Sequence, residues 1–288
     1  MPTVEDLLDR AEAAIKKSKN VDLYRPSDAR VNAEELLGEV LGKEITGDDL
    51  DDEVSTPSVR KFERLFDRRA GGEPVAIILG YIDFLGLKLA VQPGVFLPRN
   101  SSELLAEKAI ARLRRRKSPV AVDVATGIGP VAMAIASKVK GAEVFGVDIW
   151  RPSLQVARKN AKALKISNVT FLESDMLGKL PEGLRGAIDT FTIHPPYVAR
   201  NQVRTLPKEI LDFEPKVSLT DNSNDGLGLV RLLTEQAPGW LKRGGWILVE
   251  VSPDLSRRVG VILRAGGFRD VRSERDSLGA TRVISGRT

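Results

Sequence analysis

The chain has 288 residues, with no cysteine and a single histidine, His194. This composition excludes disulfides, zinc–cysteine sites, iron–sulfur clusters and cysteine nucleophiles, and it allows a Ser-His-Asp triad only if His194 serves it. The hydrophobic fraction of 42%, the charged fraction of 29% and the net charge of +5 are typical of a soluble globular enzyme. We therefore expect no metal site, and chemistry carried by carboxylates, amides, backbone groups or a bound cofactor.

The length predicts about two domains of roughly 150 residues each. No apolar run approaches the ~20 residues that a membrane helix needs. The first residues, MPTVEDLLDR, are acidic and lack the apolar core of a signal peptide. We expect a cytoplasmic protein without a membrane partner.

Residues 1–74 have the apolar spacing of helices. Ser27 is typical of a helix start and Gly42 of a helix stop. The expected helices cover about residues 7–15, 29–41 and 57–70. The sequence therefore predicts a small helical domain over residues 1–74.

A Gly71-Gly72-Glu73-Pro74 stretch interrupts the helical pattern. The two apolar runs after it, at 75–81 and 84–91, predict short strands joined through Asp83 and Gly86. We expect them to form a β-hairpin linker over residues 75–92.

From residue 93 onward, short apolar runs alternate with helical patterns. Strands are expected at 120–124, 143–147, 169–172, 187–193, 246–251, 268–273 and 280–285, and helices are expected to begin near Pro130, Pro152, Leu227 and Pro253. Repeated β–α units indicate a mostly parallel sheet that is covered by helices on both faces. We therefore predict an α/β fold for residues 93–288.

A glycine-containing turn follows the first of these strands. Gly127 and Gly129 allow a tight bend and let a ligand approach the backbone, and Pro130 suits the first turn of a helix. About 20 residues further on, Asp148 ends the next strand, where its carboxylate can accept hydrogen bonds from two ribose hydroxyls. The pattern predicts a nucleotide-like cofactor, and the alternative is a plain glycine turn.

Two cofactors fit this loop. Gly127-x-Gly129-x-x-Ala132 matches a dinucleotide fingerprint, although no hydride-side acid or base accompanies it. Asp123-x-Ala125-x-Gly127-x-Gly129 resembles the first motif of class I S-adenosylmethionine (SAM) methyltransferases. Asp123 favours SAM, because a carboxylate suits a cationic methionine group and is unfavourable beside a pyrophosphate.

The sequence places further cofactor residues after the third strand. Asp175 is expected near the adenine and Met176 on its ring, and the alternative for Asp175 is an ordinary helix N-cap. The full set of predicted cofactor residues is Asp123, Ala125, Thr126, Gly127, Gly129, Asp148, Ile149, Asp175, Met176 and His194.

We expect residues 188–193 to form a buried strand, which ends in His194-Pro195-Pro196-Tyr197. Two consecutive prolines cannot continue a central strand, so backbone carbonyls there are left to face a ligand. The motif resembles the Asn/Asp/Ser-Pro-Pro-Tyr motif of methyltransferases that modify planar nitrogens.

This motif and the Asp123–Gly129 loop are two parts of a resemblance that covers nearly the whole chain. The chain resembles the release-factor glutamine N5-methyltransferase family, which methylates the glutamine of a Gly-Gly-Gln loop in peptide chain release factors. The matching stretches are Asp28-Ala29-Arg30 with Glu34, Gly72-Glu73-Pro74, Phe84-Leu85-Gly86, residues 91–99, Glu103, Phe213-Glu214-Pro215, Asp225-Gly226-Leu227, residues 244–250 and residues 276–283. The resemblance implies a helical substrate-recognition domain, a hairpin linker and a class I methyltransferase domain with a seven-stranded sheet.

The resemblance also implies roles for the acceptor site. In the family an asparagine oxygen and the carbonyl of the first proline accept the N–H bonds of the substrate amide, while a tyrosine and a phenylalanine clamp its plane. In this chain the corresponding substrate-binding residues are Phe96, His194, Pro195, Pro196 and Tyr197, and His194, Pro195 and Tyr197 are the catalytic candidates. His194 can present a ring nitrogen as an acceptor when it is neutral.

Several positions depart from the family pattern. His194 stands where the family has asparagine, and Pro98-Arg99-Asn100-Ser101-Ser102-Glu103 lacks a proline and an acid of the usual segment. The other departures are Ile77 for tyrosine, Ala125 for glycine and Ser252 for glycine. The cofactor site is therefore expected to be intact and the acceptor site altered.

Three activities fit an altered acceptor site. The chain retains glutamine as its acceptor, or it methylates another planar or amine nitrogen of a small molecule or peptide with His194 as general base, or it binds SAM with little activity. A nucleic-acid acceptor is disfavoured, because the front domain has no basic extension interleaved with aromatic residues. We expect SAM as the cofactor and a release factor as the partner.

Overall fold

The computed structural model describes residues 1–23 and 27–288. The described chain divides into two compact units, which we call the helical unit and the sheet unit. The helical unit consists of Met1–Ile82, Val91–Pro93 and Thr205–Glu214, and the sheet unit consists of Asp83–Ala90, Gly94–Arg204 and Pro215–Thr288. One stretch from far along the chain thus packs with the N-terminal helices. The role of the front domain in substrate recognition stays a prediction.

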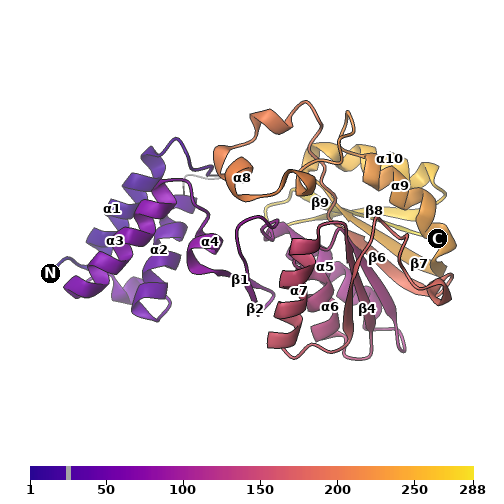
Figure 1. Cartoon of the computed structure of the whole chain (residues 1–288), viewed down its shortest axis with the longest axis horizontal. Coiled ribbons are helices and arrows are strands. Elements are labelled where there is room, and N and C mark those ends of the chain that lie inside the picture. The colour runs from indigo at the N-terminus through magenta and orange to yellow at the C-terminus, as the bar shows by residue number, and fades with distance from the viewer. Residues whose placement is uncertain (24–26) are drawn as a thin grey trace. The chain divides into compact units, whose positions relative to one another are not determined.

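The helical unit is built on three main helices. Its helices are α1 (Val4–Lys17), α2 (Asp28–Leu41), α3 (Thr56–Ala70), α4 (Val75–Leu79) and α8 (Lys208–Phe213), as Figure 1 shows. Leu7, Leu36 and Phe62 are fully buried in the core between the first three, which confirms the helical spacing of the sequence. Gly42 ends α2 in the left-handed conformation, as expected, whereas Ser27 makes no capping hydrogen bond through its side chain.

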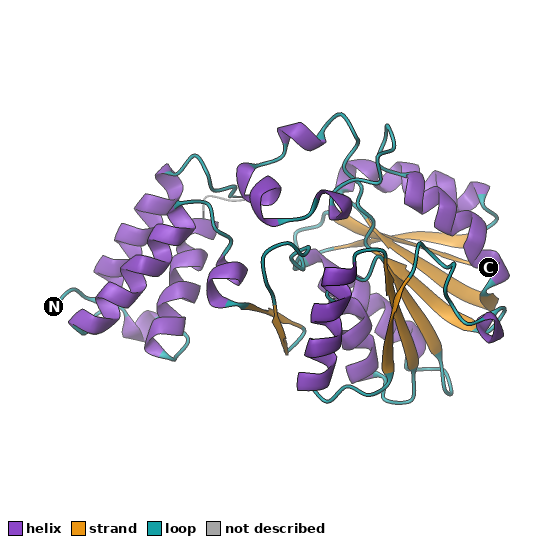
Figure 2. Cartoon of the chain, in the orientation of Figure 1, coloured by secondary structure: helices purple, strands orange, loops and turns teal. Residues whose placement is uncertain are grey.

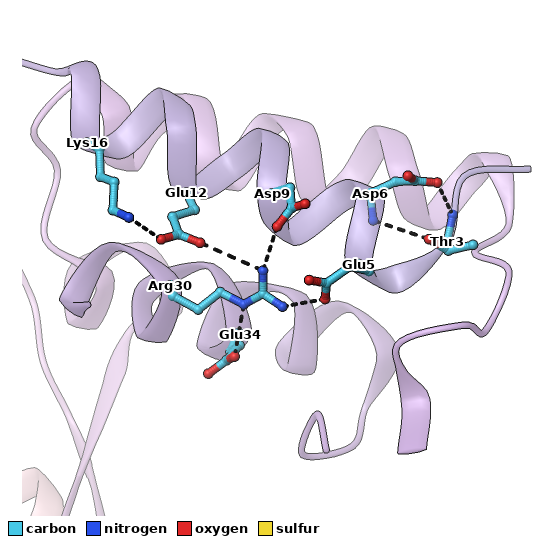
Figure 3. Close-up of polar contacts among 8 residues, drawn as sticks. All are labelled: Thr3, Glu5, Asp6, Asp9, Glu12, Lys16, Arg30 and Glu34. Atoms are coloured by element: carbon cyan, nitrogen blue, oxygen red, sulfur yellow. Dashed lines mark hydrogen bonds and ion pairs between the residues drawn. The ribbon is translucent and has the colours of Figure 1, made fainter. Parts of the chain in front are cut away.

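Polar contacts also join α1 to α2. Figure 3 shows the guanidinium of Arg30 among carboxylates of both helices. It donates to Glu5, to Asp9 at 2.9 Å and to Glu34 at 3.1 Å, and it lies 3.7 Å from Glu12. One cation therefore holds four acidic side chains together.

A buried ion pair ties the late segment to the helical unit. Arg69 of α3 is 4% exposed, and its Nη1 donates to Oε2 of Glu209 in α8 at 2.7 Å. Arg69 also donates to Asn32 Oδ1 at 2.6 Å. A buried guanidinium needs such partners, because an unpaired buried charge is strongly destabilising.

The expected strand at 75–81 is wrong. The structure has the one-turn helix α4 at Val75–Leu79, which follows Pro74 and ends at Gly80 with φ of 80°. A short apolar run fits either element, and here the flanking proline and left-handed glycine favour a helix. The hairpin is correspondingly smaller, with β1 (Tyr81–Phe84) and β2 (Leu87–Ala90) joined at Leu85 and Gly86.

The sheet unit contains a seven-stranded, mostly parallel sheet, which confirms the predicted α/β class. Its strands are β3 (Val120–Val124), β4 (Glu143–Asp148), β5 (Val169–Glu173), β6 (Ile188–Ile193), β7 (Leu241–Glu250), β8 (Arg269–Arg275) and β9 (Thr281–Arg287). Their order is β5-β4-β3-β6-β7-β9-β8, and only β9 runs antiparallel to its neighbours. β6 is buried along its whole length, as a central parallel strand should be.

Helices cover both faces of this sheet. They are α5 (Ser101–Leu113), α6 (Pro130–Lys138), α7 (Arg151–Ala163), α9 (Gly228–Gln236) and α10 (Ser256–Ala265). Figure 2 shows one group of helices on each side of the strands, with α5, α6 and α7 in one group and α9 and α10 in the other. Among the described residues, none of the helices has both the length and the apolar content needed to span a bilayer.

The strand order places a crevice at the carboxyl ends of β3 and β6. From β3 the chain moves outward to β4 and β5, and it then returns to β6 on the other side of β3. Helices that connect strands in opposite directions leave a gap at this switch point, where α/β proteins bind their ligands. The glycine loop follows β3, and the His194 motif follows β6.

Candidate active site

One cavity of the sheet unit brings the two motifs together at this crevice. Its walls include nine of the ten predicted cofactor residues, and Gly129 is the exception. Of the predicted acceptor residues, Phe96, His194, Pro195 and Pro196 also line it. Tyr197 does not, although its ring stacks on that of His194 with centroids 5.6 Å apart.

The glycine loop keeps its shape through backbone contacts and left-handed residues. Thr126 donates its N–H to the carbonyl of Val147 at 3.0 Å, and Ala125, Gly127 and Gly129 all have positive φ. At Gly129 a Cβ atom would lie 2.6 Å from Cζ of Phe171, so only glycine fits behind the loop. Gly129 is thus a packing residue, which explains why it does not line the cavity.

Asp148 holds the loop from the end of β4. Its Oδ2 accepts the N–H of Gly127 at 2.7 Å, and its Oδ1 accepts the N–H of Trp150 at 2.7 Å. Burial raises the pKa of the Asp148 carboxyl above its usual range. A carboxylate oxygen can accept more than one hydrogen bond, so both oxygens can still accept from a ligand hydroxyl.

Asp123 is the second carboxyl in the cavity. It is 3% exposed, and it accepts hydrogen bonds from the hydroxyls of Thr126 and Thr192, both at 2.6 Å. Burial raises the pKa of Asp123 to about 7. Among residues 1–23 and 27–288 no cationic side chain forms an ion pair with it, and only the two threonine hydroxyls and a backbone hydrogen bond offset the effect of burial on its pKa.

Residues that follow β4 and β5 form a further part of the cavity wall. Met176 is buried with φ of 46°, Asp175 lines the wall beside it, and the apolar side chain of Ile149 is 58% exposed. No described helix begins directly after Asp175, so its alternative as a helix N-cap does not apply. The cavity therefore combines two carboxyls, the glycine loop and the apolar side chains of Ile149 and Met176.

Two aromatic rings flank His194, which also lines the cavity. Phe96 meets the imidazole edge to face, with ring centroids 5.3 Å apart and planes at 90°, while Tyr197 is stacked on it at 19°. Burial lowers the pKa of His194 below its usual value, so the ring is neutral at pH 7. A neutral ring can accept a hydrogen bond, which a protonated one cannot.

The two prolines differ in the state of their carbonyl groups. The Pro196 carbonyl accepts the N–H of Asp221 at 3.1 Å. Within the part of the chain that the structure describes, no backbone N–H donates to the carbonyl of Pro195. The Pro195 oxygen therefore remains available to a ligand beside His194.

Sequence reasoning missed several residues of the site. Nδ1 of His194 lies 3.1 Å from Oγ of Ser102 and 3.4 Å from Oε2 of Glu250. Glu250 stands in a stretch that matches the family and Ser102 in a segment that departs from it, and both lie at an end of an element, at the start of α5 and the end of β7. The segment that contributes Val217, Ser218, Thr220, Asp221 and Asn222 to the cavity gave no signal, because it is a loop without a recognisable motif.

Comparison with known proteins decides the family. Residues 6–80 match the PrmC N-terminal domain, and residues 116–225 match a methyltransferase domain. The release factor glutamine methyltransferase of Bordetella pertussis is 36% identical over 259 residues, which cover 90% of this chain and 93% of that protein. The chain belongs to the release factor glutamine methyltransferase family. The enzyme of the same name from Burkholderia pseudomallei is 35% identical over 90% of this chain and 91% of its own length.

Solved structures agree on the fold. A 16S rRNA N2 G1207 methyltransferase of T. thermophilus, solved with AdoMet and guanosine, has a TM-score of 0.53 at 20% identity and covers 72% of this chain and 49% of its own. A methyltransferase of Pyrococcus furiosus has a TM-score of 0.51 at 15% identity, over 70% and 89% of the two chains. Family and fold confirm the prediction of a SAM-dependent methyltransferase, and the dinucleotide alternative is set aside.

Proposed function

We propose that this member of the release factor glutamine methyltransferase family transfers the methyl group of SAM to the side-chain amide nitrogen of a glutamine in a peptide chain release factor. The observation that carries the proposal is the position of the His194 motif. A ring nitrogen and the available carbonyl of Pro195 lie at one end of the cavity whose other walls fit SAM. The names of the curated relatives support the choice of acceptor.

Specific residues would hold the cofactor. Bound SAM supplies an electrophilic methyl group on a sulfonium. Asp123 is placed to stabilise a positive charge, because its buried carboxyl has no cationic partner within the described residues. Asp148 would orient the ribose, and Ile149 and Met176 would flank the adenine.

The acceptor residues would make the amide nitrogen of the substrate more reactive. An amide nitrogen is a poor nucleophile, because its lone pair is delocalised into the carbonyl. Acceptors for its N–H bonds let charge build on the nitrogen, and aromatic faces fix its plane. Pro195 and His194 provide the acceptors here, and Phe96 and Tyr197 provide the rings.

The proposal extends to the partner and its location. The helical unit, with the PrmC N-terminal match at residues 6–80, would contact the release factor outside the methylated loop. Because release factors act in translation, the same proposal places the enzyme in the cytoplasm.

A methyl-transfer assay tests the proposal. The purified chain is incubated with SAM and a release factor, and the Gly-Gly-Gln peptide is analysed by mass spectrometry. We expect one added methyl group on the glutamine, and none when that glutamine is replaced by asparagine. SAM binding by calorimetry without methylation of the glutamine would overturn the choice of acceptor.

The imidazole of His194 supports a second candidate. A ring nitrogen that can take a proton suits an amine or guanidine acceptor as well as an amide. Incubation with a cell extract and labelled SAM, followed by identification of every methylated molecule, separates the two. Label in an amine or guanidine, and none in a release factor, would favour this second activity.

A further inference from the structure

The side chains behind His194 form a connected polar group. We call Ser101, Ser102 and Glu250 the His194 support. Ser101 and Ser102 begin α5, and Glu250 ends β7. Ser101 Oγ donates to Glu250 Oε1 at 2.6 Å, and Ser102 Oγ lies 3.1 Å from Nδ1 of His194. The departure at Ser101–Ser102 and the departure at His194 therefore meet in space.

Glu250 is the unusual member of the His194 support. It is 2% exposed, and its Oε2 makes no hydrogen bond to any described residue. That oxygen lies 3.4 Å from Nδ1 of His194, which is ion-pair distance but outside good hydrogen-bond geometry. Leaving a buried carboxylate oxygen without a hydrogen bond is costly, so the arrangement needs an explanation.

The charge of Glu250 decides which ring nitrogen carries the proton. If Nδ1 were unprotonated, its lone pair would face a carboxylate oxygen and be repelled. A proton on Nδ1 can instead be donated to the Ser102 hydroxyl, and the nearby Glu250 carboxylate attracts it without a hydrogen bond. When the proton of the neutral ring is on Nδ1, Nε2 is unprotonated. Nε2 makes no hydrogen bond within the described part of the chain. His194 lines the cavity, and because its Nδ1 faces Ser102 and Glu250, Nε2 is the ring nitrogen without a partner among the described residues.

We propose that Ser102 and Glu250 are positioning residues that hold His194 in the Nδ1–H form, so that its Nε2 accepts a proton from the nitrogen being methylated. This inference rests on the proposed function for the identity of the acceptor. Glu250 also stabilises the imidazolium that forms, because its unbonded oxygen faces the new positive charge. Asparagine, the residue of the resembled family at this position, can accept a hydrogen bond but cannot take up a proton.

The step balances in atoms and charge. The acceptor nitrogen forms a bond to the methyl carbon, and the sulfur–carbon bond breaks with its electron pair going to sulfur. One N–H proton moves from that nitrogen to Nε2 of His194. The products are the N-methylated acceptor, a neutral thioether and an imidazolium paired with the Glu250 carboxylate. The proton then returns to solvent.

The charges around the ring are consistent with this role. Burial lowers the pKa of His194, Glu250 raises it and Arg99 lowers it. The other titratable groups near the ring are Tyr197, with Arg282 and Asp254 acting on it, and Asp123 across the cavity. A ring that is neutral at pH 7 is ready to accept a proton, and it loses that capacity as the pH falls through its pKa.

The single histidine makes the inference directly measurable without turnover. In protein labelled with nitrogen-15, the only imidazole signals come from His194, so their shifts report its protonated nitrogen and its pKa. We expect the Nδ1–H form to dominate in the neutral wild-type ring. Glu250→Gln should lower the pKa and increase the Nε2–H form, because an amide N–H can donate to Nδ1. Ser102→Ala should change the form in the same direction and leave the charge near the ring intact.

A matched control is Glu274→Gln, which removes a carboxylate of β8 that pairs with Lys108 and Arg112. It should leave both His194 signals unchanged. A dominant Nε2–H form in the wild type, or no change in Glu250→Gln and Ser102→Ala, would overturn the inference. If Glu250→Gln does not fold, Ser102→Ala and Ser101→Ala still decide, since Ser101 holds the other oxygen of Glu250.

Kinetics provide the second readout. Glu250→Gln should lower kcat about 10- to 100-fold and leave the SAM affinity unchanged, because the contribution of a proton acceptor is of this order or larger. The acidic limb of the pH–rate profile should move to lower pH together with the pKa seen by NMR. In a His194→Asn background the Glu250→Gln change should have no further effect on kcat. An equal loss in both backgrounds would show that Glu250 has only a structural role, whereas failure to methylate a release factor would refute the proposed function and leave the NMR result standing.

Discussion

Asp123→Asn should have opposite effects on two properties: it should remove a loss of stability that the wild type suffers at high pH, and it should weaken the binding of SAM. Burial raises the pKa of the Asp123 carboxyl from 3.8 to about 7. At ~1.4 kcal/mol per unit, ionised Asp123 destabilises the ligand-free fold by about 4 kcal/mol. The pKa of Asp123 is higher in the folded protein than in the unfolded one. Below pH 4 the carboxyl is therefore neutral in both states, and it does not lower the free energy of unfolding. The penalty grows from pH 4 to about pH 7 and is complete above it.

Asparagine has no proton to lose, so the variant lacks this penalty. The free energy of unfolding of Asp123→Asn minus that of the wild type should therefore increase by about 4 kcal/mol between pH 4 and pH 8. Urea unfolding followed by circular dichroism, without SAM, measures it at each pH. Glu143→Gln, which removes an exposed carboxylate at the start of β4, is the control and should show a constant difference. A pH-independent difference for Asp123→Asn would refute the reasoning.

The same substitution should weaken SAM binding. The charge that destabilises the ligand-free protein is the one that interacts favourably with a cationic ligand. Calorimetric titration at pH 8 should show a lower SAM affinity for Asp123→Asn than for the wild type, with Glu143→Gln unchanged. Equal affinity would show that Asp123 serves the loop alone, through Thr126 and Thr192.

Three further substitutions have clear expected outcomes. In Gly226→Ala, the new Cβ would lie 1.8 Å from the carbonyl oxygen of Tyr197, at a glycine with φ of 68°. The clash should displace Tyr197, so we expect a large loss of kcat in a methyl-transfer assay. A wild-type kcat would show that the reaction tolerates this displacement. In Gly129→Ala, the Cβ would meet the Phe171 ring at 2.6 Å with φ of 82°, so a loss of about 2–4 kcal/mol in the free energy of unfolding is expected by urea denaturation; a loss below 1 kcal/mol would contradict it. Arg30→Met leaves four carboxylates close together. Their repulsion should destabilise the helical unit by about 1–2 kcal/mol at low salt and by less at 1 M salt, as measured by thermal unfolding. A loss that does not depend on salt would show that Arg30 contributes through packing instead.

The repeating parts of the fold could be predicted from the sequence because each element has its own apolar period. β6 alternates Ile188, Phe191 and Ile193 with polar residues and has a double proline after it, and it lies buried at the centre of the sheet. The run at 75–81 misled because its flanking Pro74 and Gly80, rather than its composition, set the backbone. Periodicity is a weak guide for elements of one turn.

The site divides in the same way. Asp123 and Asp148 lie at the carboxyl ends of β3 and β4 in a parallel sheet, so their meeting in one cavity could be foreseen from the strand pattern. The contact between His194 and Glu250 could not, because β7 joins β6 through pairing that is specified by the tertiary fold. The loop that brings Asp221 to the cavity could not be predicted either, because its place is set by tertiary contacts such as the hydrogen bond from Asp221 N–H to the Pro196 carbonyl.

The pairing of Arg69 with Glu209 has a consequence for synthesis of the chain. The two residues are 140 positions apart, and at about 5–20 residues per second a ribosome needs on the order of 10 seconds to travel between them. During that interval α3 carries a guanidinium whose carboxylate partner does not yet exist. The N-terminal helices therefore cannot reach their final state as soon as they emerge, and a nascent chain arrested before residue 209 should be more sensitive to protease at α3 than one arrested after residue 214.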